Sequence, residues 1–254
     1  MSELVADPVP AAREAIASNP VWYHTLELAP GVLTPGQVDV RKTAAKLLPA
    51  DLSGMRALDV GTFDGFWAFE LERRGAEVVA IDVEAIDDAQ WPPIHRARLQ
   101  QMAGLLDVEL GRGFRSASEL LGTSVRRVVC DVLELTPDAI GGPVDVAFMG
   151  ALLVHLRDPV CALENVFASL VPGGRLYQLE TVSLPLSVLH PRRPVAHFQV
   201  LGTDFNWWCA NTATLRAWLR AAGFTEIRGL GLHHPPQRRP MNDWYHGLVS
   251  RRPA

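Results

Sequence analysis

Short apolar runs alternate with amphipathic segments along most of the chain, and the two patterns have different periods. A short apolar run bounded by Gly, Asp or Pro is typical of a buried parallel strand, whereas apolar residues three or four positions apart are typical of a helix on a sheet. The alternation predicts strands at 56–60, 77–83, 125–130, 144–149 and 175–181, helices at 65–74, 94–106, 158–170 and 212–222, and a final pair of strands at 225–232 and 244–250. We therefore expect an α/β fold with a doubly wound, Rossmann-like sheet of seven strands and a C-terminal antiparallel hairpin.

Two segments depart from this rhythm and define the expected domain organisation. Residues 1–54 indicate a small N-terminal lid, with a helix at 11–18, an extended stretch at 22–28 and a helix at 38–48. Residues 55–254 form the main domain. Within it, an insertion at about 182–211 lacks clear periodicity, and such a long irregular stretch inside a compact domain usually serves function.

The composition narrows the class of protein. Of the 254 residues, 48% are hydrophobic and 20% are charged, which excludes a disordered or collagen-like chain. The net charge of −4 argues against a dedicated nucleic-acid surface. Cys130, Cys161 and Cys209 lie far apart, so we expect no disulfide framework and no metal site. The N-terminus lacks a signal-peptide pattern and no apolar stretch is long enough to span a membrane, which favours a cytoplasmic protein without a membrane partner.

The loop after the first predicted strand, in the segment LDVGTFDGFW, carries the first chemical signal. Asp59 ends the strand, Gly61 permits a tight turn, and Gly65 opens a helix whose free N–H groups favour an anionic ligand group. A dinucleotide site would require G-x-G-x-x-G, but Phe63 replaces the middle glycine and Asp64 would repel a pyrophosphate. The loop instead suits a ligand with a carboxylate and an ammonium, such as S-adenosylmethionine (SAM). Asp59 would balance that ammonium.

Acidic residues also follow the next two predicted strands. Asp82 stands where a carboxylate can accept hydrogen bonds from both ribose hydroxyls, and Asp131 could hold the adenine amino group. Met149-Gly150, at the end of the fourth strand, would lie beneath the methionine part. A single aspartate could equally cap a helix, but ligands of α/β sheets bind at the carboxyl ends of parallel strands, and these positions follow in order. The predicted cofactor-binding residues are Asp59, Gly61, Thr62, Phe63, Gly65, Asp82, Val83, Asp131, Val132, Met149 and Gly150.

These motifs resemble those of the class I SAM-dependent methyltransferases. LDVGTFDG is similar to their first motif, IDV to their acidic loop, CDV to their adenine loop, and VPGGRLYQLET to their fifth strand with its Pro-Gly-Gly turn. The resemblance covers about residues 38–250. It implies that 55–254 is a SAM-binding methyltransferase domain, with S-adenosyl-L-methionine as cofactor and S-adenosyl-L-homocysteine (SAH) as product.

A narrower resemblance points to one branch of that class. WYHTLELAPGVLTPG, DVGTFDGFWAFELERRGA, LLVHLRDP and NWWCANTATLRAWLRAAGF resemble the branch related to the bacterial tRNA wobble-uridine (5-carboxymethoxyuridine) carboxymethyltransferase, which uses carboxy-SAM. In that enzyme a tyrosine, a lysine and an arginine help to select the extra carboxylate. Here Val154 stands where the tyrosine is expected, and the only lysines are Lys42 and Lys46. We therefore expect ordinary SAM and a transferable methyl group.

Two residues are candidates for catalysis. Methyl transfer depends mainly on positioning, but a hydroxyl or amine acceptor must also lose a proton, and a general base contributes about 10²–10⁴-fold. His155, after the fourth predicted strand, is the first candidate, although it could instead bind the backbone of the loop LRDP. Glu180, at the end of the fifth strand, is the second, with a salt bridge to an arginine as its alternative role.

Aromatic residues suggest where an acceptor would bind. Tyr23 and His24, in the predicted lid, could fold over the pocket and contact substrate. Trp207 and Trp208, at the end of the insertion, could form a wall of the acceptor pocket or contact the sulfonium by a cation–π interaction. Core packing is the alternative for both tryptophans.

The sequence thus favours a SAM-dependent methyltransferase acting on a small-molecule hydroxyl or amine, with secondary metabolism as the expected setting. A tRNA wobble-uridine modification enzyme is the first alternative, so tRNA stays open as an acceptor. A non-catalytic SAM-fold partner protein is the second. A nicotinamide dehydrogenase is disfavoured by Phe63 and Asp64.

Overall fold

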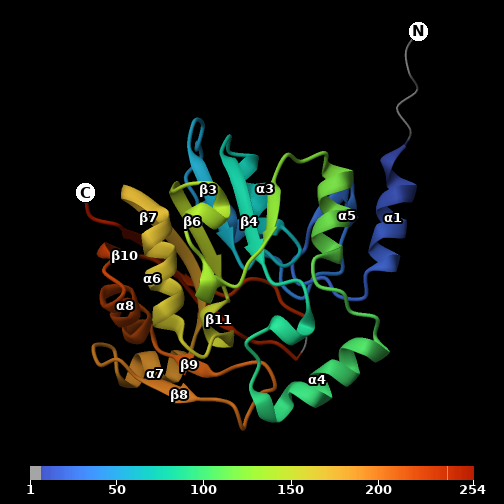
Figure 1. Ribbon diagram of the computed structural model, residues 1–254. Coiled ribbons are helices and arrows are strands. Elements are labelled where there is room, and N and C mark those ends of the chain that lie inside the picture. The colour runs from blue at the N-terminus through green and yellow to red at the C-terminus, as the bar shows by residue number, and fades with distance from the viewer. Residues whose placement is uncertain (1–6, 239) are drawn as a thin grey trace.

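The centre of the computed structural model, which describes residues 7–238 and 240–254, is a mixed sheet of seven strands (Figure 1). The strand order is β10-β11-β7-β6-β3-β4-β5. The bounds are β3 (Arg56–Val60), β4 (Glu77–Asp82), β5 (Arg126–Val129), β6 (Val144–Gly150), β7 (Leu170–Val182), β10 (Thr225–His233) and β11 (Trp244–Arg251). The strands from β7 to β5 are parallel, while β11 and β10 pair antiparallel. The predicted α/β sheet with its C-terminal hairpin is confirmed.

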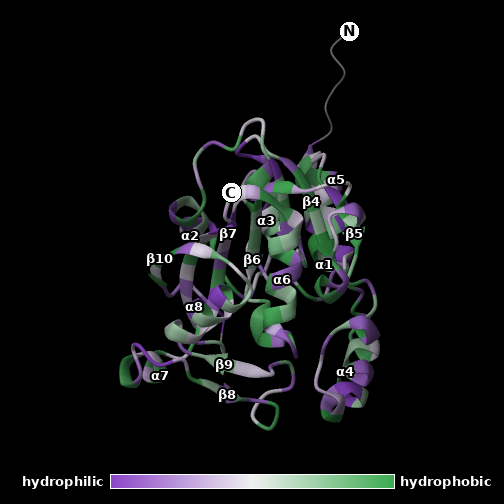
Figure 2. Cartoon of the chain, turned by 60° about the vertical axis from the view of Figure 1, so that its left-hand side comes forward, coloured by the Kyte–Doolittle hydropathy of each residue, from purple (hydrophilic) through white to green (hydrophobic). Residues whose placement is uncertain are grey.

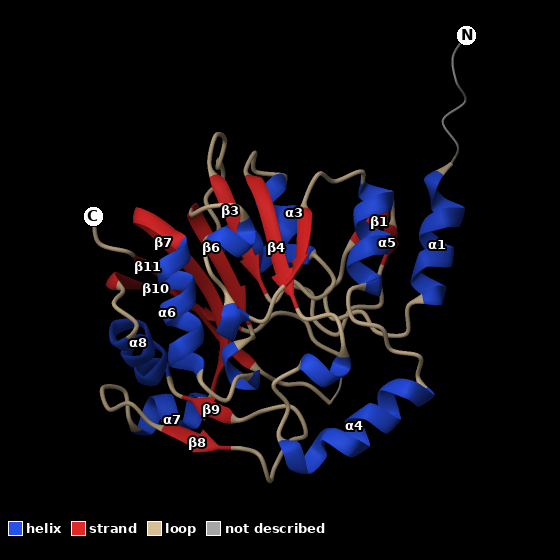
Figure 3. Ribbon diagram, viewed as in Figure 1, coloured by secondary structure: helices blue, strands red, loops and turns tan. Residues whose placement is uncertain are grey.

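Helices cover both faces of this sheet, as Figure 3 shows. One core cluster takes buried residues from α1 (Pro8–Ser18), α2 (Arg41–Leu47), α3 (Phe66–Glu72) and α5 (Arg112–Leu121). The other takes them from α6 (Pro159–Ser169) and α8 (Thr212–Ala221). Alternate residues of β3 divide between the clusters, with Ala57 in the first and Leu58 in the second, because successive strand side chains point to opposite faces. Figure 2 shows the hydrophobic residues gathered on the central strands.

Backbone pairing in the N-terminal segment alters two predicted elements. The helix predicted at 38–48 begins only at Arg41, because Val38 donates its N–H to the Tyr23 carbonyl at 2.9 Å and accepts from the Thr25 N–H at 3.0 Å. The extended stretch predicted at 22–28 is a regular strand only from Glu27, where β1 (Glu27–Ala29) pairs with β2 (Val32–Leu33). Residues 1–6 of the predicted lid lie outside the described residues.

Two irregular segments meet at the carboxyl end of the parallel strands. The insertion forms α7 (Leu184–Leu189), β8 (Ala196–Phe198) and β9 (Trp208–Ala210), and α4 (Pro93–Leu105) lies at the same end of the molecule (Figure 1). His95 of α4 bonds through Nε2 to the Val200 carbonyl at 2.6 Å, and the Trp91 ring packs edge-on against Phe205. Among the described helices, none is both long and apolar enough to cross a membrane.

Candidate functional site

The β3–α3 loop crosses the edge of the sheet in a strained backbone conformation. Gly61 has φ +73° and Phe63 has φ +47°, which a side-chain-bearing residue adopts rarely. This conformation lets the Phe63 N–H donate to Oδ2 of Asp82 at 2.7 Å. A Cβ atom on Gly61 would lie 3.0 Å from the Leu152 side chain, so glycine lets this loop pack closely against the residues after β6.

Asp59 is a buried acid with an incomplete set of hydrogen bonds. Its side chain is 1% exposed, and its Oδ2 atom has no partner among the described residues. Burial raises the pKa of Asp59 to about 7. A buried polar atom is costly unless it is paired, so the Asp59 carboxyl suits a cationic ligand group. The nearby Thr62 hydroxyl is also buried and has no partner within the described chain.

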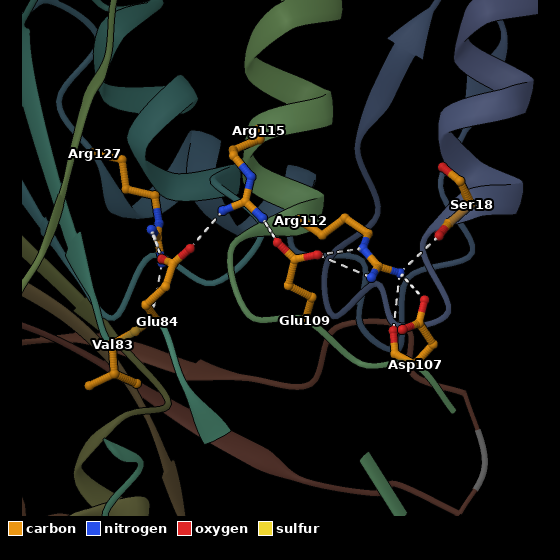
Figure 4. A network of polar contacts seen from close by, with 8 residues as sticks. All are labelled: Ser18, Val83, Glu84, Asp107, Glu109, Arg112, Arg115 and Arg127. Atoms are coloured by element: carbon orange, nitrogen blue, oxygen red, sulfur yellow. Dashed lines mark hydrogen bonds and ion pairs between the residues drawn. The ribbon is translucent and has the colours of Figure 1, made fainter. Parts of the chain in front are cut away.

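Asp82 is held at the end of β4 by backbone groups. It accepts from the N–H of Phe63 and, at 2.8 Å, from that of Val83, while burial raises its pKa. The following residues are fixed by the ion-pair chain in Figure 4, in which Glu84 binds Arg127 and Arg115. Each carboxylate oxygen of Asp82 keeps a second lone pair, so the side chain can still accept from ligand hydroxyls.

At the two strand ends predicted to border adenine and methionine, the side chains already make hydrogen bonds or lie in the core. Asp131 accepts from the Leu133 N–H at 2.9 Å and from Nε2 of Gln90 at 2.8 Å. The side chains of Val132 and Met149 are 6% and 0% exposed and lie in the core. If these two residues contact a cofactor, they do so through the backbone.

A small cavity of about 10 Å³ lies beside the ends of β6, β7 and β11. It is lined by residues from the N-terminal segment, from α3 and from the ends of three strands: Tyr23, His24, Val38, Val40, Trp67, Gly150, Ala151, Leu179 and Tyr245. The hydroxyls of Tyr23 and Tyr245 lie 3.4 Å apart. Ala151, with φ +50°, is a second strained residue at this edge. A wider hollow of about 400 Å³ lies between residues 33–41 and 236–238, away from the predicted cofactor residues.

The predicted catalytic residues stand in different surroundings. Nδ1 of His155 is 3.0 Å from the Phe205 carbonyl, and burial lowers the pKa of His155. Glu180 is 0% exposed, and its nearest donors are the N–H groups of Leu152 and Leu153, at 3.3 Å or more. Burial raises the pKa of Glu180 to about 8. No ion pair joins Glu180 to an arginine within the described residues, so the structure does not support that alternative role.

The predicted acceptor residues separate into two groups. Tyr23 and His24 line the cavity, and Asp64 holds both of them through their backbone N–H groups, at 2.9 Å and 2.7 Å. Trp207 and Trp208 do not line it. Their indole N–H groups donate to the carbonyls of Gln90 and Arg157. Their role toward an acceptor stays a prediction.

Sequence reasoning missed three residues of this region. Asp64 was interpreted only as a group that repels phosphate, and Trp67 and Tyr245 carried no motif. A useful signal for Asp64 was available, because an acid at a position that packs against the sheet needs a partner. Its partner, His24, lies 40 residues away in the sequence.

Comparison with known proteins decides the family. A sequence model of the Methyltransferase domain family matches residues 36–228. The chain belongs to this family. The methyltransferase is 29% identical over 204 residues to a tRNA U34 carboxymethyltransferase from Desulfotalea psychrophila, covering 78% of the chain and 54% of that protein. It is also 29% identical over 191 residues to a ubiquinone biosynthesis O-methyltransferase from Xylella fastidiosa, covering 74% of the chain and 68% of that protein.

The fold of the methyltransferase recurs in solved structures. The N-terminal domain of EvdMO1, crystallised in the presence of SAH and D-fucose, superposes with a TM-score of 0.61 at 20% identity and covers 97% of each chain. The fold is therefore that of the class I SAM-dependent methyltransferases, as predicted. The methyltransferase spans about half the length of the first tRNA U34 carboxymethyltransferases that it matches.

The residues at the strand ends fit SAM as a ligand. The unpaired Oδ2 of Asp59 can take an ammonium, and Asp82 can accept from a ribose. None of these residues requires a phosphate group on the ligand.

Proposed function

We propose that this methyltransferase transfers a methyl group from SAM to a hydroxyl or amine of a small molecule. The observation that supports this most is the cavity that Tyr23, His24, Trp67 and Tyr245 enclose beside Gly150. Its aromatic walls are typical of sites that bind small molecules. The net charge of −4 also argues against the excess of positive charge that RNA binding favours.

SAM supplies a methyl carbon on a positively charged sulfur with a good leaving group. Asp59 would bind the ammonium of the methionine part, Asp82 the ribose hydroxyls, and Asp131 the adenine amino group. A hydrogen bond to a charged group stabilises by about 1.5–3 kcal/mol. Gly61 and the backbone of Met149-Gly150 would let the methionine part lie between the loop and β6.

His155 and Glu180 would contact the acceptor at the other side of the transferred group. A carbonyl only accepts, so Nδ1 of His155 carries a proton toward Phe205 and leaves the Nε2 lone pair free. With a pKa of about 8, Glu180 is mostly protonated at neutral pH and would donate a hydrogen bond to the acceptor. Both roles hold the acceptor oxygen or nitrogen in line with the methyl carbon.

Modification of the tRNA wobble uridine is the second candidate. The similarity to proteins named tRNA U34 carboxymethyltransferases favours it. Against carboxy-SAM, the position where the resemblance expects a tyrosine holds Val154, which is buried at 7% exposure and offers no donor to a carboxylate. A non-catalytic partner protein is a third reading.

The test begins with calorimetric titration of the protein with SAM and with SAH. We expect both to bind, and failure of both would end the proposal. SAM carrying a labelled methyl group is then incubated with the protein and, separately, with small-molecule extract and with bulk tRNA. Label in the small molecules supports the proposal, label in tRNA alone selects the second candidate, and binding without transfer selects the third.

A further inference from the structure

A buried histidine that lines the cavity is paired with a buried carboxylate, and the proposed function assigns neither of them a chemical step. Nδ1 of His24 lies 2.6 Å from Oδ1 of Asp64, and both residues are buried, at 6% and 1% exposure. A carboxylate accepts, so Nδ1 carries the proton and Nε2 keeps the lone pair. Nε2 makes no hydrogen bond within residues 7–238 and 240–254. The same side chain lines the cavity.

The imidazole is fixed in position from several directions. Its ring stacks on Phe66, with centroids 5.3 Å apart, and packs edge-on against Tyr23 and Trp67. From behind, the Thr34 hydroxyl donates to the His24 carbonyl at 2.8 Å. A side chain that is locked by packing and by a carboxylate loses little entropy when it meets a reactant, which is what a catalytic group requires.

The backbone behind His24 is built to allow this placement. The turn at 34–38 passes so close that a Cβ atom on Gly36 would lie 2.3 Å from the carbonyl carbon of His24. Glycine is therefore required at position 36, because any side chain there would collide with the backbone of His24. Asp64 itself also binds the N–H groups of Tyr23 and His24, so one carboxylate sets both the backbone and the ring.

We propose that His24 is the general base of the methyl transfer and that Asp64 is its positioning residue. This rests on the proposed function. The acceptor oxygen forms a bond to the methyl carbon as the carbon–sulfur bond breaks, and that bond's electron pair stays on sulfur. The acceptor's O–H proton passes to Nε2 of His24. Asp64 stabilises the resulting imidazolium, which then loses its proton to water.

This assignment explains the departure from a glycine-rich loop. In a dinucleotide site the position of Asp64 would oppose a phosphate, whereas here the carboxylate faces the N-terminal segment rather than the ligand. It also separates the roles of the three groups. Glu180 and His155 contact the acceptor, and His24 takes its proton.

The first experiment compares His24→Asn with the wild type, using labelled SAM and the acceptor found in the extract assay. The Asn amide nitrogen can occupy the place of Nδ1 and keep the bond to Asp64, but it offers no base at the place of Nε2. We expect kcat to fall by about 10²–10⁴-fold with little change in KM. His234→Asn, with an exposed side chain in the loop between β10 and β11, is the matched control and keeps wild-type activity.

Three measurements separate chemistry from structure. Thermal melting and SAM calorimetry should show that His24→Asn folds and binds SAM as the wild type does. In His24→Ala, added imidazole should restore part of the rate, which a structural role would not allow. In Asp64→Asn the rate should fall by about 10- to 100-fold, the share of a charged hydrogen bond.

The pH profile provides the last readout. The titratable groups around the His24 ring are Asp64 and Asp59 on the β3–α3 side, Tyr23 beside it, Tyr245 from β11, and Glu180, which acts on Tyr23. The decrease in kcat/KM toward acid pH should disappear in His24→Ala assayed with a fixed amount of neutral imidazole. If that decrease persists in the variant at saturating SAM, another group takes the proton and the assignment is contradicted.

The outcomes distinguish the two proposals. If the wild type methylates the acceptor and His24→Asn stays within about threefold of its rate, His24 is not the base but the proposed function stands. If the wild type binds SAM and methylates nothing, both fall. If His24→Asn fails to fold, imidazole rescue of His24→Ala decides, and absence of rescue overturns the proposal.

Discussion

The N-terminal segment 22–38 and the insertion 183–211 both border the predicted site, but different interactions hold them. The N-terminal segment is buried: Trp22 is 2% exposed, and the segment's link to the β3–α3 loop is the buried pair of His24 and Asp64. The insertion is fastened at its outer side by tryptophan and histidine rings that bond to backbone carbonyls, and by a partly exposed ion pair between Arg98 and Asp204. Its loop carries Leu201, which is 88% exposed.

This difference indicates a division of labour. A buried segment with charged and aromatic contacts keeps one geometry, which suits groups that carry out chemistry. An exposed segment with few buried contacts can change its side chains without loss of the fold, which suits selection among acceptors. The predictions below test this contrast, beginning with the largest expected effect.

Truncation of Trp22, the buried aromatic residue of the N-terminal segment, tests the contrast most strongly. Trp22→Ala should lower the free energy of unfolding by about 3–5 kcal/mol, because it leaves a cavity between the N-terminal segment and α5. Urea unfolding followed by circular dichroism measures this. A loss below about 1 kcal/mol would mean that the segment is not part of the core.

Removal of the ribose acid sharpens the contrast at the cofactor side. Asp82→Ala should weaken SAM binding by about 10- to 100-fold, which corresponds to about 1.5–3 kcal/mol. Calorimetric titration measures the affinity. Asp88→Ala, exposed after the same strand, is the matched control. Equal affinity in Asp82→Ala and wild type would contradict the ribose assignment.

The buried acids predict how stability depends on pH. Burial raises the pKa of Glu180 from 4.5 to about 8, so between these values the folded state holds a proton that the unfolded state has lost. The free energy of unfolding therefore falls as pH rises from about 5 to 8, by at most about 1.4 kcal/mol per pH unit for this group. Glu180→Gln should match the wild type at pH 5 and exceed its stability at pH 8. Exposed Glu164→Gln, as control, should leave the slope unchanged.

The protonation of Asp59 should change when the cofactor binds. Because its pKa is about 7, a ligand ammonium would favour the ionised form and release a proton at pH 6. The enthalpy of SAM binding at that pH should then depend on the ionisation enthalpy of the buffer. An enthalpy that is equal in all buffers would show that the ammonium lies elsewhere.

Truncation in the insertion should have the smallest effect. Leu201→Ala removes an exposed side chain, and such changes usually alter stability by less than about 0.5 kcal/mol. Any effect should appear in the choice of acceptor. A destabilisation as large as that of Trp22→Ala would remove the contrast between the two segments.

Much of the sheet could be predicted because each buried strand is marked in the sequence by a short apolar run. The run RALDV predicted the bounds of β3, since most residues of a strand buried on both faces are apolar. Helix α5 was not predicted, because it opens with the segment Gly111-Arg112-Gly113 and buries only a few residues. The short strands β8 and β9 escaped prediction because three-residue strands have no period and exist through their pairing.

The site was predictable only in part, for a similar reason. Asp59 and Asp82 lie in the last residues of β3 and β4, where the sequence placed them, and stay predictions as SAM contacts. The pairing of His24 with Asp64 depends on the path of the N-terminal segment, which no local pattern encodes. The polar environment of a side chain is a property of the folded chain, so the sequence suggested His24 as a contact and not as one half of a pair.

The contact between the hydroxyls of Tyr23 and Tyr245 joins residues 222 positions apart. A ribosome must therefore deliver almost all the intervening chain before the cavity has its second tyrosine wall. Nascent protein with every parallel strand already made would still lack a finished compartment, because β11 is synthesised after them and inserts beside β7. The cavity is therefore complete only once β11 has paired with β7.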